Sequence, residues 1–516
     1  MIKNDSVQLK IGTLLSYAQM GLSVIIGLIY TPVMIRLLGK SEYGLYNTVS
    51  STISMMSVLS LGFNSSYIRF YSKYKAEGSS EKLNKLNGLF LLIFIVIGSV
   101  AFLCGVFLSQ NLHIVFDSGL TQAEYKTAKI LMYILTINLA VSFPMLAFSS
   151  IISAHEKYVI LKLIGILKTV AGPLVTLPLL LIGYRSIAMV SVTVTLSLIA
   201  DVIYLFYVLV ILKCKFSFGK VDEGLAKELS AYTLFIAIEL IVDQINWNVD
   251  KVLLARLKGT SSVAVYSVGY SLYSYYQLCS SSISGVFTPR IHKIVISTMH
   301  DSRLQREKLT ELFVKVGRIQ FLLLFLLASG IIFFGKYFIV NIWAGNGYDE
   351  SYYVSLLLII PSSIALIQNL GIEIQRAKNI HRFRSIVYIF MALINVVVSY
   401  VLCRKYGATG SAFGTALSLV LANGLIMNIF YHKRCNLDII FFWKNILRMF
   451  AGLLPSFVVG YLLCKFITIS NIFDFALCVL VYLLTYCMSA WLFCMNEFEK
   501  RLITTPIKRA FRSRRR

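Results

Sequence analysis

Residues Ser230–Ser271 read SAYTLFIAIELIVDQINWNVDKVLLARLKGTSSVAVYSVGYS. This apolar span carries acidic residues where a helix facing lipid should have none. At about 100° per residue, an arc of about 60° on one helix face contains four polar residues, which are Glu239, Asp243, Asn246 and Asp250. Each ionised carboxylate at the bilayer centre costs at least ~2.5–3.5 kcal/mol. We therefore expect this face, the acidic stripe, to line a wet cavity or to meet cationic partners.

The end of this span repeats the end of the first apolar span of the chain. Four pairs of identical residues lie 220 positions apart, namely Arg36 and Arg256, Gly39 and Gly259, Tyr46 and Tyr266, and Ser51 and Ser271. The spacing predicts a chain built from two related halves.

The composition is that of a polytopic membrane protein. The chain has 516 residues, of which 57% are hydrophobic and 14% charged, and its mean hydropathy is +0.75. About fourteen apolar stretches are long enough to cross a bilayer of ~30 Å. They cover residues 11–36, 43–68, 87–110, 128–153, 158–182, 186–212, 229–255, 262–287, 312–340, 351–375, 385–403, 410–431, 446–466 and 473–494.

The positions of Lys and Arg predict the orientation. Placing the N-terminus inside puts about three quarters of the 49 basic residues on the cytoplasmic side, where short basic loops remain. An even number of helices then brings the C-terminus inside as well. The net charge of +25 follows from the same rule, so nucleic acid is not an expected partner. We expect a multi-pass protein of the cell membrane.

Six crossings return the chain to the cytoplasm, so helices 1–6 and 7–12 run in the same direction. The two halves are then parallel repeats related by an axis along the membrane normal. We place an N-lobe at residues 1–220, a C-lobe at 221–441, and two further helices with a basic tail at 442–516.

Three segments resemble the polysaccharide transporter family, the lipid-linked oligosaccharide flippases of the superfamily that also holds multidrug exporters and lipid II flippases. They are YTPVMIRLLGKSEYGLYNTVSS (Tyr30–Ser51), NVDKVLLARLKGTSSVAVYSVG (Asn248–Gly269) and KYGATGSAFGTALS (Lys405–Ser418). The resemblance implies two six-helix lobes around a central cavity, helices 13 and 14, and transport by alternating access. It also implies an undecaprenyl-pyrophosphate-linked oligosaccharide as substrate, with polysaccharide assembly proteins as further partners.

A pyrophosphate headgroup needs cations within the membrane. Lys168 is the best of these, since it lies about ten residues into a span, at ~15 Å depth, where its ammonium cannot easily reach the surface. It either lines the cavity or pairs with Asp243, Glu239 or Asp201. Arg36 and Arg256 either anchor helix ends at the interface or line the outer mouth. The remaining candidates are Arg69 and Lys251.

Glu239 and Asp243 lie one turn apart, and two carboxylates at low dielectric favour uptake of a proton or Na⁺. They are therefore candidates for ion coupling, together with Asp250. The alternative is a structural pair neutralised by Lys168 or polar neighbours, with Asp250 capping the helix or pairing with Lys251.

No cofactor or metal is expected. The six histidines are scattered without the spacing of metal ligands, and no G-x-x-x-x-G-K-[ST] loop for ATP occurs. Pro173 and Pro178 predict an irregular outer half for their helix.

Three functions compete. The first is a flippase that exports a lipid-linked glycan for capsule, exopolysaccharide or another surface polymer. The second is another transporter of the superfamily, either a lipid II flippase or a drug antiporter, although drug antiporters typically have twelve helices. The third is a polytopic glycosyltransferase or polymerase. Such enzymes need a sizeable loop for catalysis, and the longest expected here, residues 289–311, is basic with few carboxylates. We therefore do not expect an enzyme.

Overall fold

The structure is a computed structural model in which the chain folds into α-helices. It describes residues 2–60, 62–116, 120–219, 223–378, 380, 382–502 and 504–505, apart from the side chains of 2–7, 9–10, 65, 223–236 and 238–239. The described residues contain no β-strand, which confirms the predicted all-α fold. They form two compact units.

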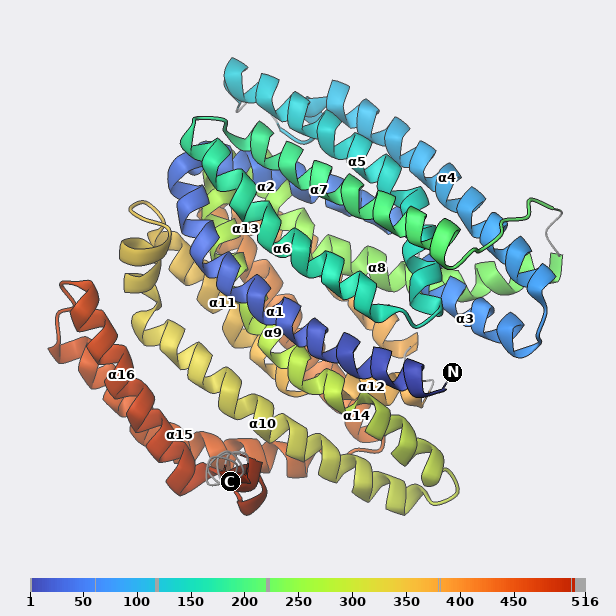
Figure 1. Cartoon of the computed structure of the whole chain (residues 1–516). Helices are drawn as coiled ribbons and strands as arrows, with labels where there is room; N and C mark the ends of the chain where they lie inside the picture. Colours follow the sequence, from blue (N-terminus) through green and yellow to red (C-terminus); the bar gives the residue numbers. More distant parts are fainter. Residues whose placement is uncertain are drawn as a thin grey trace, which may run out of the picture. The chain divides into compact units, whose positions relative to one another are not determined.

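The first unit comprises residues 1–268 and 388–415. Its helices are α1 (Ile2–Leu38), α2 (Lys40–Met55), α3 (Phe63–Ala76), α4 (Ser80–Gln110), α5 (Gln122–Ala154), α6 (Tyr158–Leu181), α7 (Ser186–Phe206) and α8 (Glu223–Lys258), with parts of α9 (Thr260–Ser297) and α13 (Arg382–Leu419). Within it α1 runs beside α6, and α4 beside α5 (Figure 1).

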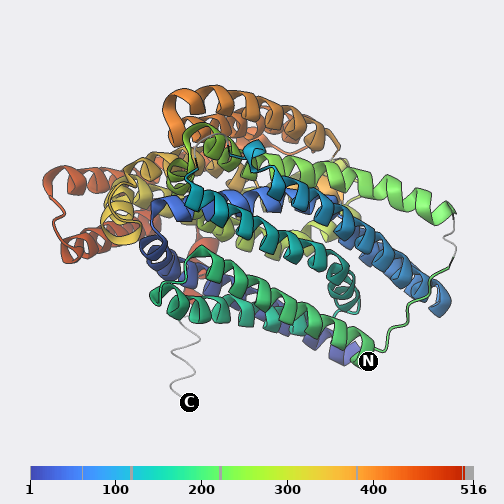
Figure 2. The ribbon, with the colours of Figure 1, turned by 90° about the horizontal axis from the view of Figure 1, so that it is seen from above.

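The second unit comprises residues 269–387 and 416–516. Besides the remainder of α9 and α13, it contains α10 (Ser302–Tyr337), α11 (Asp349–Ile367), α12 (Leu370–Ala377), α14 (Met427–Lys433), α15 (Ile439–Phe466) and α16 (Ile472–Ser489). The α15–α16 pair, in red, packs on the yellow helix α10 (Figure 2). Phe334, Leu453 and Tyr482 are buried in this contact.

Ten helical segments of the described chain are long and apolar enough to cross a membrane. One of them, Arg382–Lys433, is interrupted at Gly407, whose φ of 58° and ψ of −133° are not helical, so it supplies two crossings. The pair α2–α3 and the helices α8 and α9 occupy the three other predicted spans. The helices thus follow the fourteen predicted stretches.

The turns of the repeat are built alike. Gly39 between α1 and α2 has φ 78°, and Gly259 between α8 and α9 has φ 82°. Glycine adopts this left-handed conformation without steric cost, whereas other residues resist it. The same residue 220 positions apart therefore makes the same turn.

Two predicted spans are each broken into shorter helices. Span 43–68 divides into α2 and α3, separated by a 3₁₀ turn and by Gly62, which has a left-handed φ of 72°. Span 351–375 divides into α11 and α12 at Gln368 and Asn369, whose side chains donate to Asn428 and Ser284. Backbone bonds to the carbonyl three residues earlier, from the N–H groups of Gln368, Asn369, Gly371 and Ile372, satisfy the main chain across the break.

Two further expectations were wrong. α6 is continuous through Pro173 and Pro178, because each proline removes a single backbone donor while the neighbouring bonds of the helix remain. The basic segment 289–311 is not a long loop, since α9 extends to Ser297 and α10 begins at Ser302. Asp301 caps α10 by accepting from the backbone N–H groups of Arg303 and Leu304.

Candidate functional site

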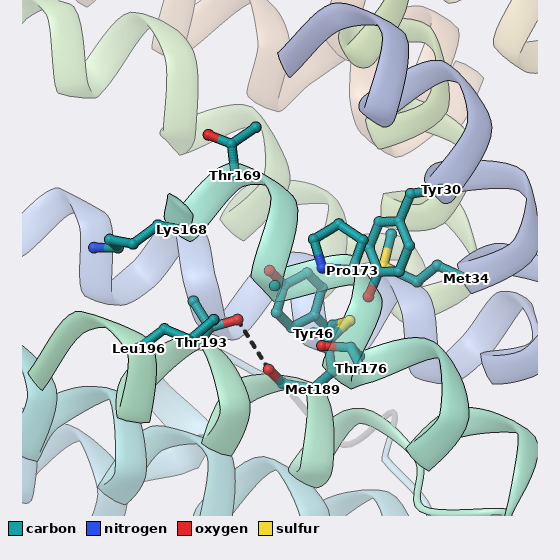
Figure 3. A pocket seen from close by; sticks show the side chains of 11 residues that line it. Tyr30, Met34, Tyr46, Lys168, Thr169, Pro173, Thr176, Met189, Thr193 and Leu196 are labelled. Carbon is teal, nitrogen blue, oxygen red and sulfur yellow. Dashed lines mark hydrogen bonds between the residues drawn. The ribbon is translucent and has the colours of Figure 1, made fainter. Parts of the chain in front are cut away.

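The first unit contains a cavity of about 310 Å³ among α1, α2, α6 and α7 (Figure 3). Its lining combines one cation with hydroxyl, phenol and thioether groups. The residues are Tyr30, Met34, Tyr46, Lys168, Thr169, Gly172, Pro173, Thr176, Met189, Thr193 and Leu196. A cavity inside a helical bundle with a few polar groups is a typical ligand site.

Lys168 contributes the cation of this cavity from the middle of α6. Its Nζ donates to Ser197 Oγ at 2.9 Å on the neighbouring helix α7. In Figure 3 the side chain extends away from Tyr30 and Pro173. Its ammonium also interacts electrostatically with Asp201, one helical turn beyond Ser197. Lys168 therefore borders this cavity, and its ammonium interacts with a carboxylate of α7. Its role in a cleft between the two lobes stays a prediction, because the helices that line this cavity all belong to the first repeat.

Asp201 has one oxygen in use and one that remains unpaired. Ser142 hydrogen-bonds to its carboxylate, while its Oδ2 is buried without a hydrogen-bond partner among the described residues. A buried acceptor without a partner is costly. The nearby positive charge of Lys168 offsets part of that cost.

Asp250 lies at the centre of a buried hydrogen-bond network, and only 1% of its surface is exposed. Its Oδ1 accepts from Ser411 Oγ at 2.7 Å. Its Oδ2 accepts from Thr415 Oγ1 at 2.6 Å and from the Tyr266 hydroxyl at 2.8 Å. Three hydroxyl donors stabilise the charged form of this carboxylate without neutralising it. The residue does not cap α8, since the helix continues to Lys258.

Oxygens of α13 extend this network. Asn395 Oδ1 accepts from Ser399 Oγ at 2.9 Å and lies 3.3 Å from Thr415 Oγ1. Ser399 Oγ is also 3.1 Å from the Ser411 carbonyl. Carboxylate, carbonyl and hydroxyl oxygens are the ligands that hard cations prefer. The arrangement can therefore hold a proton on the carboxylate or a small cation among the oxygens.

The other members of the acidic stripe are placed differently. Asp243 is exposed on α8, seven residues before buried Asp250. Glu239 lies on the same helix, but its side chain is outside the described residues. The acidic stripe is therefore exposed at Asp243 and buried at Asp250.

The remaining predicted cations do not line the cavity. Arg36 and Arg256 are exposed in the last turns of α1 and α8, as the repeat requires. Arg69 is exposed on α3. Lys251 is only 8% exposed and interacts electrostatically with adjacent Asp250.

Sequence reasoning missed the two tyrosines of the cavity, although the repeat contained the signal. Tyr46 lines the cavity, and its counterpart Tyr266 bonds to Asp250. Tyr30 also lines the cavity, and the residue 220 positions later is Asp250 itself. Equivalent positions of the two repeats thus carry a phenol in one polar site and a carboxylate in the other.

The part of unit 1 around residue 41 joins the two repeats. The Ser41 hydroxyl donates to Glu124 Oε1 and lies 2.8 Å from Thr260 Oγ1. Thr260 also hydrogen-bonds to the Glu124 carboxylate, so both hydroxyls meet at this acidic side chain. A Cβ added to Gly44 would lie 1.8 Å from the Thr260 carbonyl oxygen. We call this contact of Ser41, Gly44, Glu124 and Thr260 the turn contact.

Comparison with known proteins agrees with this architecture. The model of the family described as "Polysaccharide biosynthesis protein" matches residues 10–295. No curated protein matches the chain.

Several solved structures share the fold. The lipid II flippase MurJ in an inward closed conformation has a TM-score of 0.68 at 16% identity, covering 92% of this chain and 98% of its own. An inward-facing multidrug resistance transporter of the MATE family has a TM-score of 0.60 at 13% identity, covering 84% and 98%. A MOP superfamily transporter from Pyrococcus furiosus has a TM-score of 0.59 at 11% identity, covering 84% and 96%. Identities this low establish the fold that this chain shares with these transporters, but not its substrate or mechanism.

The match to the family model spans more than half of the sequence, and this multi-pass membrane protein therefore belongs to the family of polysaccharide biosynthesis proteins.

Proposed function

We propose that the protein is a flippase that moves an undecaprenyl-pyrophosphate-linked oligosaccharide from the inner to the outer leaflet of the cell membrane. The product would enter a capsule, an exopolysaccharide or another surface polymer. The N-lobe (1–220) and C-lobe (221–441) would alternate access to a central site, while residues 442–516 accompany the C-lobe. Family membership and the shared transporter fold support this proposal.

The observation that carries the proposal is Lys168 in an intramembrane cavity. A lysine at this depth is costly unless it has a function or a partner. The ammonium of Lys168 donates to the neutral hydroxyl of Ser197, and Asp201 acts on it only through its charge. A lysine that borders a cavity of neutral hydroxyls would attract a phosphate or an acidic sugar that enters it. Arg36 and Arg256 would attract the headgroup at the outer mouth, and Arg69 and Lys251 are the further proposed contacts.

The turn contact is the proposed outer closure for alternating access. It joins a residue of the first repeat, Ser41, to one of the second, Thr260, at the ends that the topology places outside. Neutral hydrogen bonds of this kind contribute about 0.5–1.5 kcal/mol each. A contact of that strength can close the outer side and still be broken in each cycle.

Ion coupling would use the acidic stripe. Asp250, with its ring of oxygens, is the proposed site for H⁺ or Na⁺, and exposed Asp243 with Glu239 would pass the ion to it along one face of α8. Loading this site would favour one arrangement of α8 and α13, since Ser411 and Thr415 belong to α13.

The test is substitution of Lys168 in cells whose own copy of the gene is deleted. We expect Lys168→Arg to restore surface polysaccharide and Lys168→Ala to reduce it at least about tenfold, because losing one desolvated charge contact removes more than ~1.4 kcal/mol. Lys162→Ala is the matched control, since Lys162 lies on the same helix and does not line the cavity. Full export by well-expressed Lys168→Ala would remove the lysine from the mechanism.

A second candidate function is the flipping of lipid II, favoured by the extent of the likeness to MurJ. The lipid that accumulates in the inner leaflet after gene deletion separates the two candidates. A lipid-linked oligosaccharide supports the first and a lipid-linked peptidoglycan precursor the second. Accumulation of neither, with changed drug resistance instead, would favour a drug antiporter.

A further inference from the structure

The segment that follows α16 is held against α10 by a buried ion pair. Arg318 of α10 donates from Nε to Glu499 Oε1 at 2.6 Å and from Nη2 to Oε2 at 2.9 Å. The same Nη2 donates to the Cys494 carbonyl at 2.8 Å. Arg318 is 9% exposed and Glu499 4%. A bidentate pair of this kind fixes the direction of the segment as well as its position.

Local contacts shape the segment around this pair. The Asn496 backbone N–H donates to Glu499 Oε2, and the Glu499 N–H donates back to Asn496 Oδ1, each at 2.9 Å. Such reciprocal bonding starts a helical turn. The Lys315 ammonium of α10 lies 3.5 Å from the centroid of the Phe498 ring. The segment is therefore docked on α10 by both charge and aromatic contacts.

Basic and apolar side chains lie together on the docked segment. Lys500 lies over the Trp491 ring, and Arg501 is exposed with Glu497 as its i,i+4 partner. Exposed apolar side chains accompany them, which are Trp491, Leu492, Phe493, Phe498 and Leu502. Residues 500–516 carry eight Lys and Arg and no Asp or Glu. Aromatic and aliphatic groups beside cations are typical of the boundary between acyl chains and headgroups.

We propose that the docked segment and α10 form a binding site for anionic lipid headgroups. Its cations are Lys315, Lys500 and Arg501, which we call the inner basic cluster. The Arg318–Glu499 ion pair holds the segment in the position that this site needs. The adjoining exposed apolar side chains can pack against the acyl chains of a lipid. The acidic surface of a soluble protein would not bury them. The proposal uses the predicted cytoplasmic position of the C-terminus, where anionic lipids attract basic residues with about 1 kcal/mol each. It does not depend on the transported substrate.

The test compares two neutralised glutamates in purified full-length protein. Glu499→Gln and Glu497→Gln change the net charge equally, but only the first breaks the buried ion pair, since Glu497 is exposed. The measurement is the amount of phosphatidylglycerol retained, from mixed vesicles of phosphatidylglycerol and phosphatidylcholine, by native mass spectrometry.

If net charge alone governed binding, both variants would retain slightly more phosphatidylglycerol than wild type. We expect Glu499→Gln to retain less phosphatidylglycerol than wild type and Glu497→Gln to retain at least as much, because Glu497→Gln also frees Arg501 from its i,i+4 partner. Loss of each basic residue of the cluster should weaken phosphatidylglycerol binding about fivefold, so Lys500→Gln/Arg501→Gln should lose most of its preference over phosphatidylcholine.

Arg318→Lys provides a second variant in case Glu499→Gln folds poorly. It keeps the charge but cannot form the bidentate pair, so it should also retain less phosphatidylglycerol than wild type. Equal retention by Glu499→Gln and Glu497→Gln, or by Arg318→Lys and wild type, overturns the proposal. A tail that is needed for export in cells but shows no preference for phosphatidylglycerol would point to an acidic protein instead and would overturn it equally.

Discussion

At the scale of single residues, the two repeats carry different chemistry at equivalent positions. Asp250 is held by three hydroxyl donors, whereas Tyr30, 220 residues earlier, lines a cavity together with Tyr46. A carboxylate can take up a proton or a cation, but a phenol binds neither at neutral pH. We infer that ion coupling belongs to the second repeat and that the cavity of the first repeat serves the substrate.

The Asp250→Asn variant tests this assignment. An ion that binds the folded protein at about 100 times its dissociation constant stabilises it by about 2.7 kcal/mol. Wild type should therefore show an unfolding midpoint that rises with Na⁺ or shifts with pH, and Asp250→Asn should lose that response because a neutral amide replaces the carboxylate. Asp243→Asn, with the same change on the exposed part of the stripe, should keep most of the response. An unchanged response in Asp250→Asn would make its network purely structural.

Some residues of the two polar sites could be predicted from the sequence and others could not, for physical reasons. The acidic stripe and Lys168 were recognisable because charges are costly in an apolar span. Ser411 and Thr415 were not, because they bond to Asp250 from 161 and 165 residues away and hydroxyls are common in membrane helices. The cavity residues of α1 and α7 were hidden as well, since helices that are apolar on all sides show no periodicity to mark a face.

At the scale of elements, hydropathy predicted where the helices lie, while polar side chains decided where they break. Gly62 ends one span early through its positive φ. The amide groups of Gln368 and Asn369 interrupt another by bonding to neighbouring helices. Such breaks depend on tertiary partners, which hydropathy along one segment does not contain.

The two repeats approach each other closely at Gly44 of α2, and a single added methyl group tests the role of this contact. In Gly44→Ala the new Cβ would meet backbone atoms of Thr260, so α2 and α9 must separate and the outer closure cannot form. We expect export to fall and a Val263→Cys reporter, one turn beyond Thr260 on α9 and buried in the closed arrangement, to react with a membrane-impermeant maleimide. Gly21→Ala is the control, because nothing lies within 4 Å of its added Cβ. Normal export with an unreactive reporter in Gly44→Ala would show that the turn contact is not a closure.

At the scale of the whole molecule, the energetics of transport depend on which charges cross the membrane. In the proposed cycle the protein returns empty after each delivery, so the charge of Lys168 would move out and back and cancel over the cycle. The net charge moved is that of the substrate, together with any ion carried on the return. Within the first unit, the Asp250 network and the cavity beside Lys168 are separate sites. The ion and the headgroup could therefore bind independently.

We therefore expect transport to respond to membrane potential. A headgroup with about two negative charges gains about 2.3 kcal/mol per charge per 100 mV when it moves to a positive outer side. In vesicles with a fluorescent lipid-linked oligosaccharide, imposing about 100 mV should raise the steady-state ratio of outer to inner lipid about two-thousandfold if the full field acts on both charges. Inward return of H⁺ or Na⁺ through Asp250 would add to this electrical term, because a cation that moves inward and an anion that moves outward transfer charge in the same sense. It would also add the chemical gradient of the ion. Asp250→Asn should consequently retain the response to potential and lose the response to the ion. A wild-type distribution that is insensitive to potential at every ion gradient would mean that compensating charge accompanies the headgroup, and the cycle proposed here would be wrong.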